Sequence, residues 1–308
     1  MGVNGIIVKG DNSPKTLTST AGDDALVGTY AAEVFYSGLG DDDMYGAAGN
    51  DYFYADLGDD FIDGGSGTDT ISFDFVNLTD AYERSTIGVS FDLTKGKQDL
   101  GYYGVKQVYN VENIEGTQVN DRLYGNEANN RLRGLAGNDR LDGRDGNDRL
   151  EGEAGNDTLV GGSGDDQLVG SSGSDKFFSG TGADVLSGYF ENGLTDDGAR
   201  DTFVYSSTSD SGTKSTTRDT IYGFFSGSDG DKIDLSGIDA NGSKSGDGKF
   251  TFIGSNSFHS NSTSEVQVIA TGNANEFVVN IDTDSDNKAE MRIVVYSTSA
   301  LTASDFIL

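Results

Sequence analysis

Carboxylates recur at a fixed spacing in two stretches of this chain, residues 20–73 and 117–188. In both stretches an acidic or amide side chain appears every nine residues. These positions are Asp24, Glu33, Asp42, Asp51, Asp60 and Asp69, then Asp121, Asn130, Asp139, Asp148, Asp157, Asp166, Asp175 and Asp184. Carboxylate oxygens are the hard ligands that Ca²⁺ prefers in proteins. The spacing therefore predicts rows of calcium-binding turns.

Glycine and one apolar residue keep the same period. In eleven repeats a glycine stands two residues before the acidic position: Gly22, Gly40, Gly49, Gly58, Gly67, Gly137, Gly146, Gly155, Gly164, Gly173 and Gly182. An apolar residue follows the acidic position by two: Leu26, Phe35, Met44, Phe53, Ile62 and Ile71, then Leu123, Leu132, Leu141, Leu150, Leu159, Leu168, Phe177 and Leu186. Ala31, Val119 and Ala128 replace the glycine in three repeats, where we expect weak binding or a capping role.

Each repeat has room for one short strand and one turn. Strand alternation points the single apolar residue inward, and glycine allows the turn to adopt positive φ. Two strands and two turns make a coil of 18 residues, so each carboxylate faces the one 18 residues later, with turn carbonyls between them. Without a cation these charges would repel. We therefore expect folding and calcium binding to be coupled.

This pattern resembles the RTX, or haemolysin-type, repeat, in which a large apolar residue follows a Gly- and Asp-containing turn. The resemblance implies a parallel β-roll with several Ca²⁺ ions between successive turns. The carboxylate pairs that it implies are Asp42 with Asp60, Asp51 with Asp69, Asp139 with Asp157, Asp148 with Asp166, Asp157 with Asp175, and Asp166 with Asp184.

The composition argues against several classes of binding partner and structure. The 308 residues carry a net charge of −30 with a pI near 4.1, which argues against nucleic acid and anionic membranes. The 17 Phe and 14 Tyr weigh against disorder. No cysteine is present, so disulfides and thiolate zinc sites are excluded. No apolar run is long enough to insert into a membrane.

We expect an all-β chain of five segments. These are an N-terminal cap (1–19), a first β-roll (20–73), a β insertion (74–116), a second β-roll (117–188) and a C-terminal β domain (189–308). Aromatic residues of the insertion could line a groove, although core packing is favoured: Phe73, Phe75, Tyr82, Phe91, Tyr102, Tyr103 and Tyr109. The expected core of the C-terminal domain is Phe203, Val204, Tyr205, Ile221, Phe224, Phe225, Ile233 and Leu235.

The segment after residue 188 resembles the C-terminal domain of serralysin-type metalloproteases and other exported RTX proteins. The chain ends in Asp305, Phe306, Ile307 and Leu308, which resembles the uncleaved signal of type I secretion substrates. The resemblance implies that the type I secretion apparatus of a Gram-negative cell exports the chain. Low cytosolic Ca²⁺ would keep the repeats unfolded, and extracellular Ca²⁺ would fold them.

A further acidic loop lies between two expected strands of the C-terminal domain. Asp282, Asp284 and Asp286 occupy positions 1, 3 and 5 of an EF-hand-like loop, and Asn287 takes the place of the usual glycine. The loop is too short for a full EF-hand. A calcium loop and a plain acidic hairpin turn are equally good interpretations.

No residue is predicted to be catalytic. The one histidine, His259, lies in a Ser/Asn-rich loop, where we expect it to face solvent, and H-E-x-x-H and G-x-S-x-G are absent. Four successive repeats carry an outward arginine: Arg122, Arg131, Arg140 and Arg149. Charge balance against neighbouring acids is the favoured explanation, and a site for an anionic polysaccharide is the alternative.

The sequence thus predicts a non-catalytic extracellular calcium-binding protein with a structural, adhesive or matrix-interaction role. One alternative is that the chain is the accessory and secretion region of a larger exocellular enzyme, a protease or a polysaccharide-modifying enzyme such as an alginate epimerase. A weak glycan-active enzyme that uses the insertion is a third.

Overall fold

The computed structural model describes residues 7–9, 16–74, 87–189, 198–240, 249–259, 264–284 and 286–308, the first of these ranges by its backbone alone. The chain divides into two compact units, Met1–Gly143 and Arg144–Leu308. The helical elements of the described residues are two 3₁₀ turns, η1 (Gly101–Tyr103) and η2 (Ala303–Asp305). Within these ranges no helix has the length and apolar character needed to cross a membrane.

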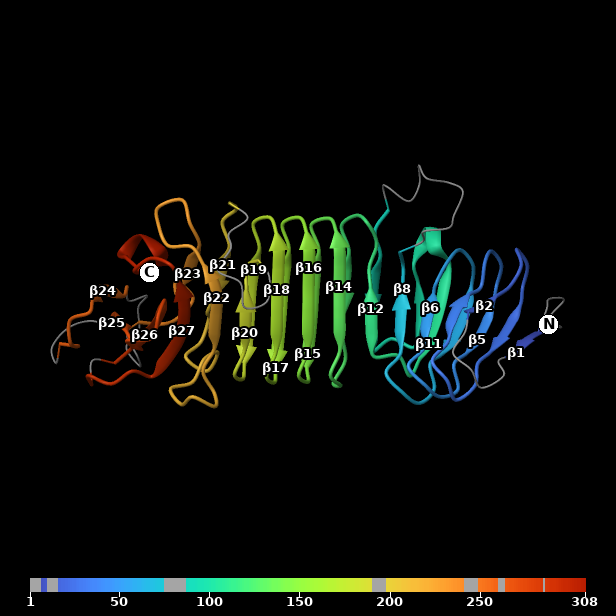
Figure 1. Cartoon of the computed structure of the whole chain (residues 1–308), viewed down its shortest axis with the longest axis horizontal. Helices are drawn as coiled ribbons and strands as arrows, with labels where there is room; N and C mark the ends of the chain where they lie inside the picture. The colour runs from blue at the N-terminus through green and yellow to red at the C-terminus, as the bar shows by residue number, and fades with distance from the viewer. Residues whose placement is uncertain are drawn as a thin grey trace. The chain divides into compact units, whose positions relative to one another are not determined.

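In the first unit, short strands stack side by side into three sheets (Figure 1). One sheet has the order β1 (Ile7–Lys9), β3 (Ala25–Val27), β5 (Asp43–Tyr45), β7 (Asp60–Asp63), β11 (Val105–Tyr109) and β10 (Lys97–Asp99). The next has the order β2 (Thr16–Thr18), β4 (Val34–Tyr36), β6 (Tyr52–Tyr54), β8 (Thr70–Ser72), β12 (Asn113–Glu115) and β14 (Arg131–Ala136). The last contains β9 (Ser90–Asp92), β13 (Arg122–Tyr124) and β15 (Arg140–Asp145). The described strands here pair in parallel, except that β10 pairs antiparallel with β11.

The second unit contains parallel strands and an antiparallel region. One sheet has the order β16 (Arg149–Ala154), β18 (Gln167–Ser172), β20 (Val185–Ser187), β22 (Thr220–Phe224), β27 (Met291–Ser297), β26 (Glu276–Asp282), β25 (Glu265–Ala270) and β24 (Thr251–Gly254). Its β25, β26 and β27 pair antiparallel. The other sheet has the order β17 (Thr158–Ser163), β19 (Lys176–Thr181), β21 (Thr202–Val204), β23 (Lys232–Asp234) and β28 (Phe306–Ile307).

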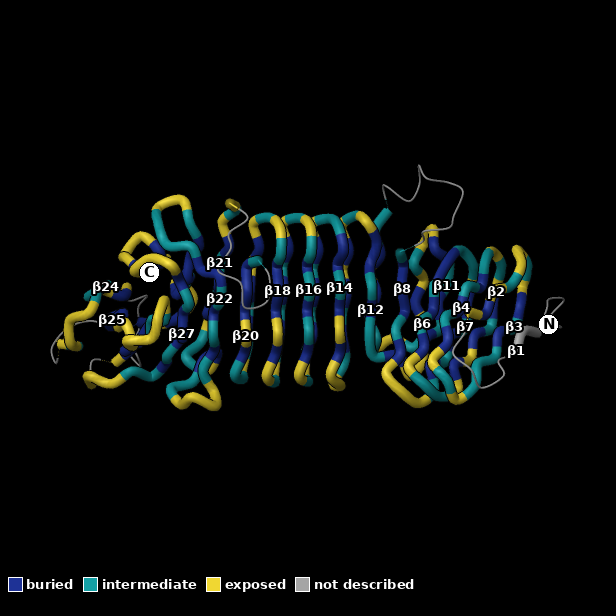
Figure 2. The backbone as a smooth tube through the Cα atoms, in the orientation of Figure 1, coloured by how far each residue is buried: buried dark blue, intermediate teal, exposed yellow. Residues whose placement is uncertain are grey.

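The register of the sheets confirms the coil of 18 residues. Leu17 pairs with Phe35, Phe35 with Phe53 and Phe53 with Ile71. All fourteen apolar repeat residues are at most 1% exposed, because alternation along each strand turns one side chain inward. Figure 2 shows this as dark blue segments between less buried neighbours. Stacked rings fill part of this core, with the Phe35 and Phe53 centroids 4.5 Å apart. The all-β parallel roll is therefore confirmed.

The insertion at residues 74–116 supplies strands to the rolls. Strand β11 pairs with β7, and β12 pairs with both β8 and β14. Phe73, Phe91 and Tyr103 are buried in the core, whereas Tyr102 and Tyr109 are exposed. Phe75 and Tyr82 lie outside the described residues. Core packing, rather than a groove, thus explains three of the aromatic residues.

Most of the expected C-terminal core is buried. Phe203, Tyr205, Ile221, Phe224, Ile233 and Leu235 are at most 1% exposed. Val204 and Phe225 are only partly buried, because Val204 lies on the outward side of β21 and Phe225 follows the end of β22. The boundary between the two units, at Gly143 and Arg144, falls inside the second array.

Candidate metal centres

The repeat carboxylates stand in columns that link one coil to the next. The Oδ1 atom of one aspartate accepts a hydrogen bond from the backbone N–H of the aspartate 18 residues earlier, as in Asp148 N–H to Asp166 Oδ1 at 2.8 Å. The same bond joins Asp24 to Asp42, Asp42 to Asp60, Asp51 to Asp69, Asp121 to Asp139, Asp157 to Asp175 and Asp166 to Asp184, over 2.7–3.1 Å. The expected pair of Asp139 with Asp157 spans the two units, and its geometry is not described.

The columns extend beyond the residues that the nine-residue spacing identifies. Asp201, Asp219 and Asp231 accept from the N–H groups of Asp175, Asp184 and Asp201, respectively, over 2.9–3.1 Å. These three residues were missed because loops of irregular length separate them from the array. A signal was available, since each stands two residues before a buried apolar residue: Phe203, Ile221 and Ile233.

The second carboxylate oxygen carries the strongest indication of a cation. The Oδ2 atoms of Asp42, Asp51, Asp69, Asp166, Asp184 and Asp219 are buried and accept no hydrogen bond from any described residue. A buried ionised carboxylate is costly unless a positive charge compensates it. The fold thus creates anionic oxygens that it does not itself satisfy.

Backbone carbonyl oxygens lie in the same turns. In the Asp51 turn, the carbonyl oxygens of Ala47 and Gly49 face Gly65 and Gly67 of the next coil so closely that a Cβ there would collide with them. In the Asp166 turn, those of Gly162 and Gly164 face the glycines of the next coil in the same way. These two turns therefore offer the carbonyl oxygens four and two residues before the aspartate, together with its buried Oδ2. An all-oxygen set of this kind fits Ca²⁺.

In ten repeats the glycine two residues before the aspartate is required by its backbone conformation. Its φ lies between +120° and +155°, a region that side chains strongly disfavour. These are Gly40, Gly49, Gly58, Gly67, Gly137, Gly146, Gly155, Gly164, Gly173 and Gly182. The glycines predicted as part of the metal sites therefore shape the turn and contribute carbonyl oxygens.

Burial changes the acidity of these carboxyl groups. Desolvation raises the pKa of Asp42 and Asp51 from 3.8 to about 7. It raises the pKa of Asp166 and Asp184 from 3.8 to about 8, and repulsion from neighbouring aspartates adds to both shifts. Both causes disfavour the charged form. A bound cation would reverse this effect, because it stabilises the carboxylate.

The Asp60 turn differs from the others. Its Oδ2 accepts a hydrogen bond from the Nζ of Lys106 at 2.5 Å. Oxygen atoms of Asp42, Asp56 and Asp60 lie within 4.8 Å of one another, and all three residues are buried.

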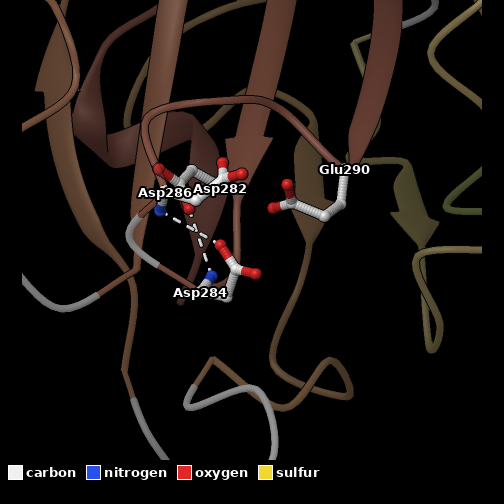
Figure 3. A group of neighbouring side chains, drawn as sticks. All are labelled: Asp282, Asp284, Asp286 and Glu290. Atoms are coloured by element: carbon white, nitrogen blue, oxygen red, sulfur yellow. Dashed lines mark hydrogen bonds between the residues drawn. The ribbon is translucent and has the colours of Figure 1, made fainter. Parts of the chain in front are cut away.

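The acidic loop after β26 brings four carboxylates together (Figure 3). Ligand atoms of Asp282, Asp284, Asp286 and Glu290 lie within 4.8 Å of one another. Asp282 is buried and accepts the N–H groups of Asp284 and Asn287 at 3.1 Å. Asn287 has a φ of 69°, a conformation in which glycine is common. Glu290 was missed as a candidate ligand, and both the calcium loop and the acidic hairpin turn fit this geometry.

The outward arginines have acidic neighbours. Arg140 pairs with Asp142 at 3.2 Å, and Arg149 pairs with Glu151 at 2.7 Å. Arg122 lies beside Arg140 in the register of β13 and β15, and Arg131 begins β14. The pairs with Asp142 and Glu151 favour charge balance as the role of these arginines.

The remaining candidates lie in the second unit. Asp305 is fully buried, and Phe306 packs against Phe252 with ring centroids 5.4 Å apart. Ile307 ends β28 and Leu308 ends the chain. The His259 side chain is exposed, as expected, but its Nδ1 also lies 2.8 Å from Oε1 of the buried Glu265.

The repeats match a known family model. The family model of the RTX calcium-binding nonapeptide repeat matches residues 18–52, 36–71 and 115–150. No curated protein sequence matches the chain. The extracellular lipase LipA from Serratia marcescens has a solved structure that is similar at a TM-score of 0.30 and 15% identity, over 94% of this chain and 40% of the lipase chain. The chain thus spans less than half the length of that lipase.

The family model of the serralysin C terminal of peptidase M10 matches residues 142–308, more than half of the chain. The resemblance that the sequence suggested is confirmed both for the repeats and for the C-terminal domain. The chain belongs to the serralysin C-terminal family and carries RTX calcium-binding repeats.

Proposed function

We propose that the chain is a non-catalytic extracellular module that a type I system exports unfolded and that Ca²⁺ then folds. The observation that carries this proposal is the set of six buried Oδ2 atoms without a hydrogen-bond partner among the described residues. The family matches to RTX repeats and to the serralysin C-terminal domain support both calcium binding and secretion.

Calcium would act on folding through the turns. Each carboxylate already uses Oδ1 to hold the preceding coil, so Oδ2 and the turn carbonyls remain for an ion. Bound Ca²⁺ supplies the positive charge that these oxygens require. Because the unfolded chain has no such cage, the binding free energy becomes folding free energy. Cytosolic Ca²⁺ would be too low to fold the repeats, and extracellular Ca²⁺ would be sufficient.

Circular dichroism of the full chain tests this coupling. In EGTA we expect a largely disordered spectrum, and added Ca²⁺ should convert it to β structure. Added Mg²⁺ should not, because it demands smaller octahedral sites and gives up its water reluctantly. A chain that is equally folded in EGTA would contradict the proposal.

For the biological role we propose structural, adhesive or matrix interactions. The second candidate is an accessory and secretion region of a larger exocellular enzyme, which the match to a peptidase C-terminal domain favours. Reading the native gene upstream of Met1 distinguishes the two. A catalytic domain encoded in the same frame supports the second role, and a stop codon directly upstream supports the first.

A further inference from the structure

One lysine stands in a column of aspartates. Strand β11 pairs in parallel with β7, and their register places Lys106 opposite Asp60. Strands β3, β5 and β7 place Asp24, Asp42 and Asp60 one above another in this column. Lys106 thus occupies the place that the next aspartate would take.

The lysine side chain is directed into the turn before it. Lys106 is 0% exposed, which is unusual for an ammonium group. Its Nζ donates to the carbonyl oxygen of Asp56 at 2.6 Å, the carbonyl oxygen of Gly58 at 2.8 Å and Asp60 Oδ2 at 2.5 Å. All three donated protons therefore reach an oxygen.

These three oxygens are equivalent to the calcium ligands expected elsewhere. Asp56 and Gly58 stand four and two residues before Asp60, as Ala47 and Gly49 do before Asp51. In the Asp51 turn the Oδ2 atom has no described hydrogen-bond partner, whereas in the Asp60 turn the Oδ2 atom binds the ammonium group. The Lys106 nitrogen therefore marks the point on which the three oxygens converge.

We propose that the ammonium group of Lys106 replaces a calcium ion in the Asp60 turn. The insertion adds β11 as the last parallel strand of this sheet, before the antiparallel β10, and so ends the column of aspartates with a cation that belongs to the chain. Calcium does not fit this turn while Lys106 fills it. One end of the array is thus neutralised at any Ca²⁺ concentration, and the repeats hold fewer ions than they have aspartates. This inference rests on the proposed calcium-dependent folding.

The test counts ions on the full chain. Wild type, Lys106→Ala and the control Lys95→Ala are saturated with Ca²⁺, and bound calcium is measured by equilibrium dialysis. Lys95 lies in the same insertion with a side chain that is 64% exposed. We expect Lys106→Ala to bind one ion more than wild type and Lys95→Ala to bind the same number. A folded Lys106→Ala variant that binds the wild-type number, or fewer, overturns the inference.

A second measurement covers the case in which Lys106→Ala does not fold at ordinary Ca²⁺ concentration. Raising Ca²⁺ should then restore β structure, while the same increase of Mg²⁺ or NaCl should not. Lys106→Met fills the space without a charge, so calcium should not rescue it. Failure of calcium to rescue Lys106→Ala overturns the inference. Wild type that binds no calcium would contradict the proposed function instead, so the two failures are distinguishable.

Discussion

The substitution Asp166→Asn should remove a calcium ligand and leave the shape of the turn unchanged. Asp166 Oδ1 accepts the Asp148 N–H at 2.8 Å, and an asparagine Oδ1 can keep this bond. The buried Oδ2, which accepts no hydrogen bond, becomes an amide nitrogen that cannot bind a cation. We therefore expect the variant to bind at least one ion fewer than wild type.

The size of the effect depends on the calcium concentration. An ion that binds only the folded state adds about 1.4 kcal/mol to the unfolding free energy for each tenfold rise in Ca²⁺. The increase of the unfolding free energy per tenfold rise in Ca²⁺, the calcium slope, should therefore be smaller for Asp166→Asn by about 1.4 kcal/mol. Without calcium the variant should instead be more stable than wild type. Burial raises the pKa of Asp166 from 3.8 to about 8, so asparagine removes a cost on the order of 4 kcal/mol at pH 7.

Asp165→Asn is the matched control from the same turn. Asp165 is exposed, and its Oδ1 accepts the Ala183 N–H at 2.9 Å. In the preceding coil Asn147 accepts the equivalent bond, so asparagine is compatible with this position. Urea unfolding, followed by circular dichroism at several Ca²⁺ concentrations, gives the slopes. Equal slopes for Asp165→Asn and Asp166→Asn would refute the assignment of Oδ2 as a ligand.

Three further predictions follow from the same geometry. The raised pKa of Asp184, about 8 instead of 3.8, means that the ion-free turn holds its proton more tightly than the unfolded chain does. The stability of the ion-free chain should therefore fall as the pH rises from about 4 to 8. Over the same range the calcium affinity should rise by up to about tenfold per pH unit for each proton released. Calcium titrations at pH 6, 7 and 8 measure this rise, and a pH-independent midpoint would contradict it. Asp219→Asn should lower the calcium slope as Asp166→Asn does, because the Asp219 Oδ2 is also buried without a described partner; an unchanged slope would place Asp219 outside the metal sites. Replacing Arg122, Arg131, Arg140 and Arg149 with glutamine should leave calcium-driven folding intact. Binding to alginate beads then distinguishes charge balance from a polysaccharide site, since only a polysaccharide site predicts that binding falls.

The nine-residue spacing predicted the features of the fold that depend on local geometry. Leu26 and Phe35 face inward because a three-residue strand can bury only one side chain, and this constraint is visible in the sequence. The positive φ of Gly40 and Gly49 follows equally from the turn that joins two such strands. The column of carboxylates then follows from stacking coils of equal length.

The nine-residue spacing did not identify the residues of the column where coils have unequal length. Asp201 continues the column after a loop that breaks the period, and the contact with the Asp175 N–H identifies it. Lys106 bonds to Asp60, which lies 46 residues earlier in the sequence, so no local pattern could relate the two. Parallel pairing across an insertion depends on which strands meet, and that is determined by packing rather than by periodicity.

The burial of the C-terminal residues bears on the order of export and folding. The buried carboxylate of Asp305 accepts the Gly227 N–H and the Ser226 hydroxyl proton, both at 2.7 Å. Phe306 pairs with Ile233 in a strand of the folded domain. A receptor that binds these side chains therefore competes with the folded domain for the same atoms. If these residues are the export signal, the export receptor must bind them before the chain folds. Folding then buries the signal, so that a molecule already outside the cell no longer exposes it.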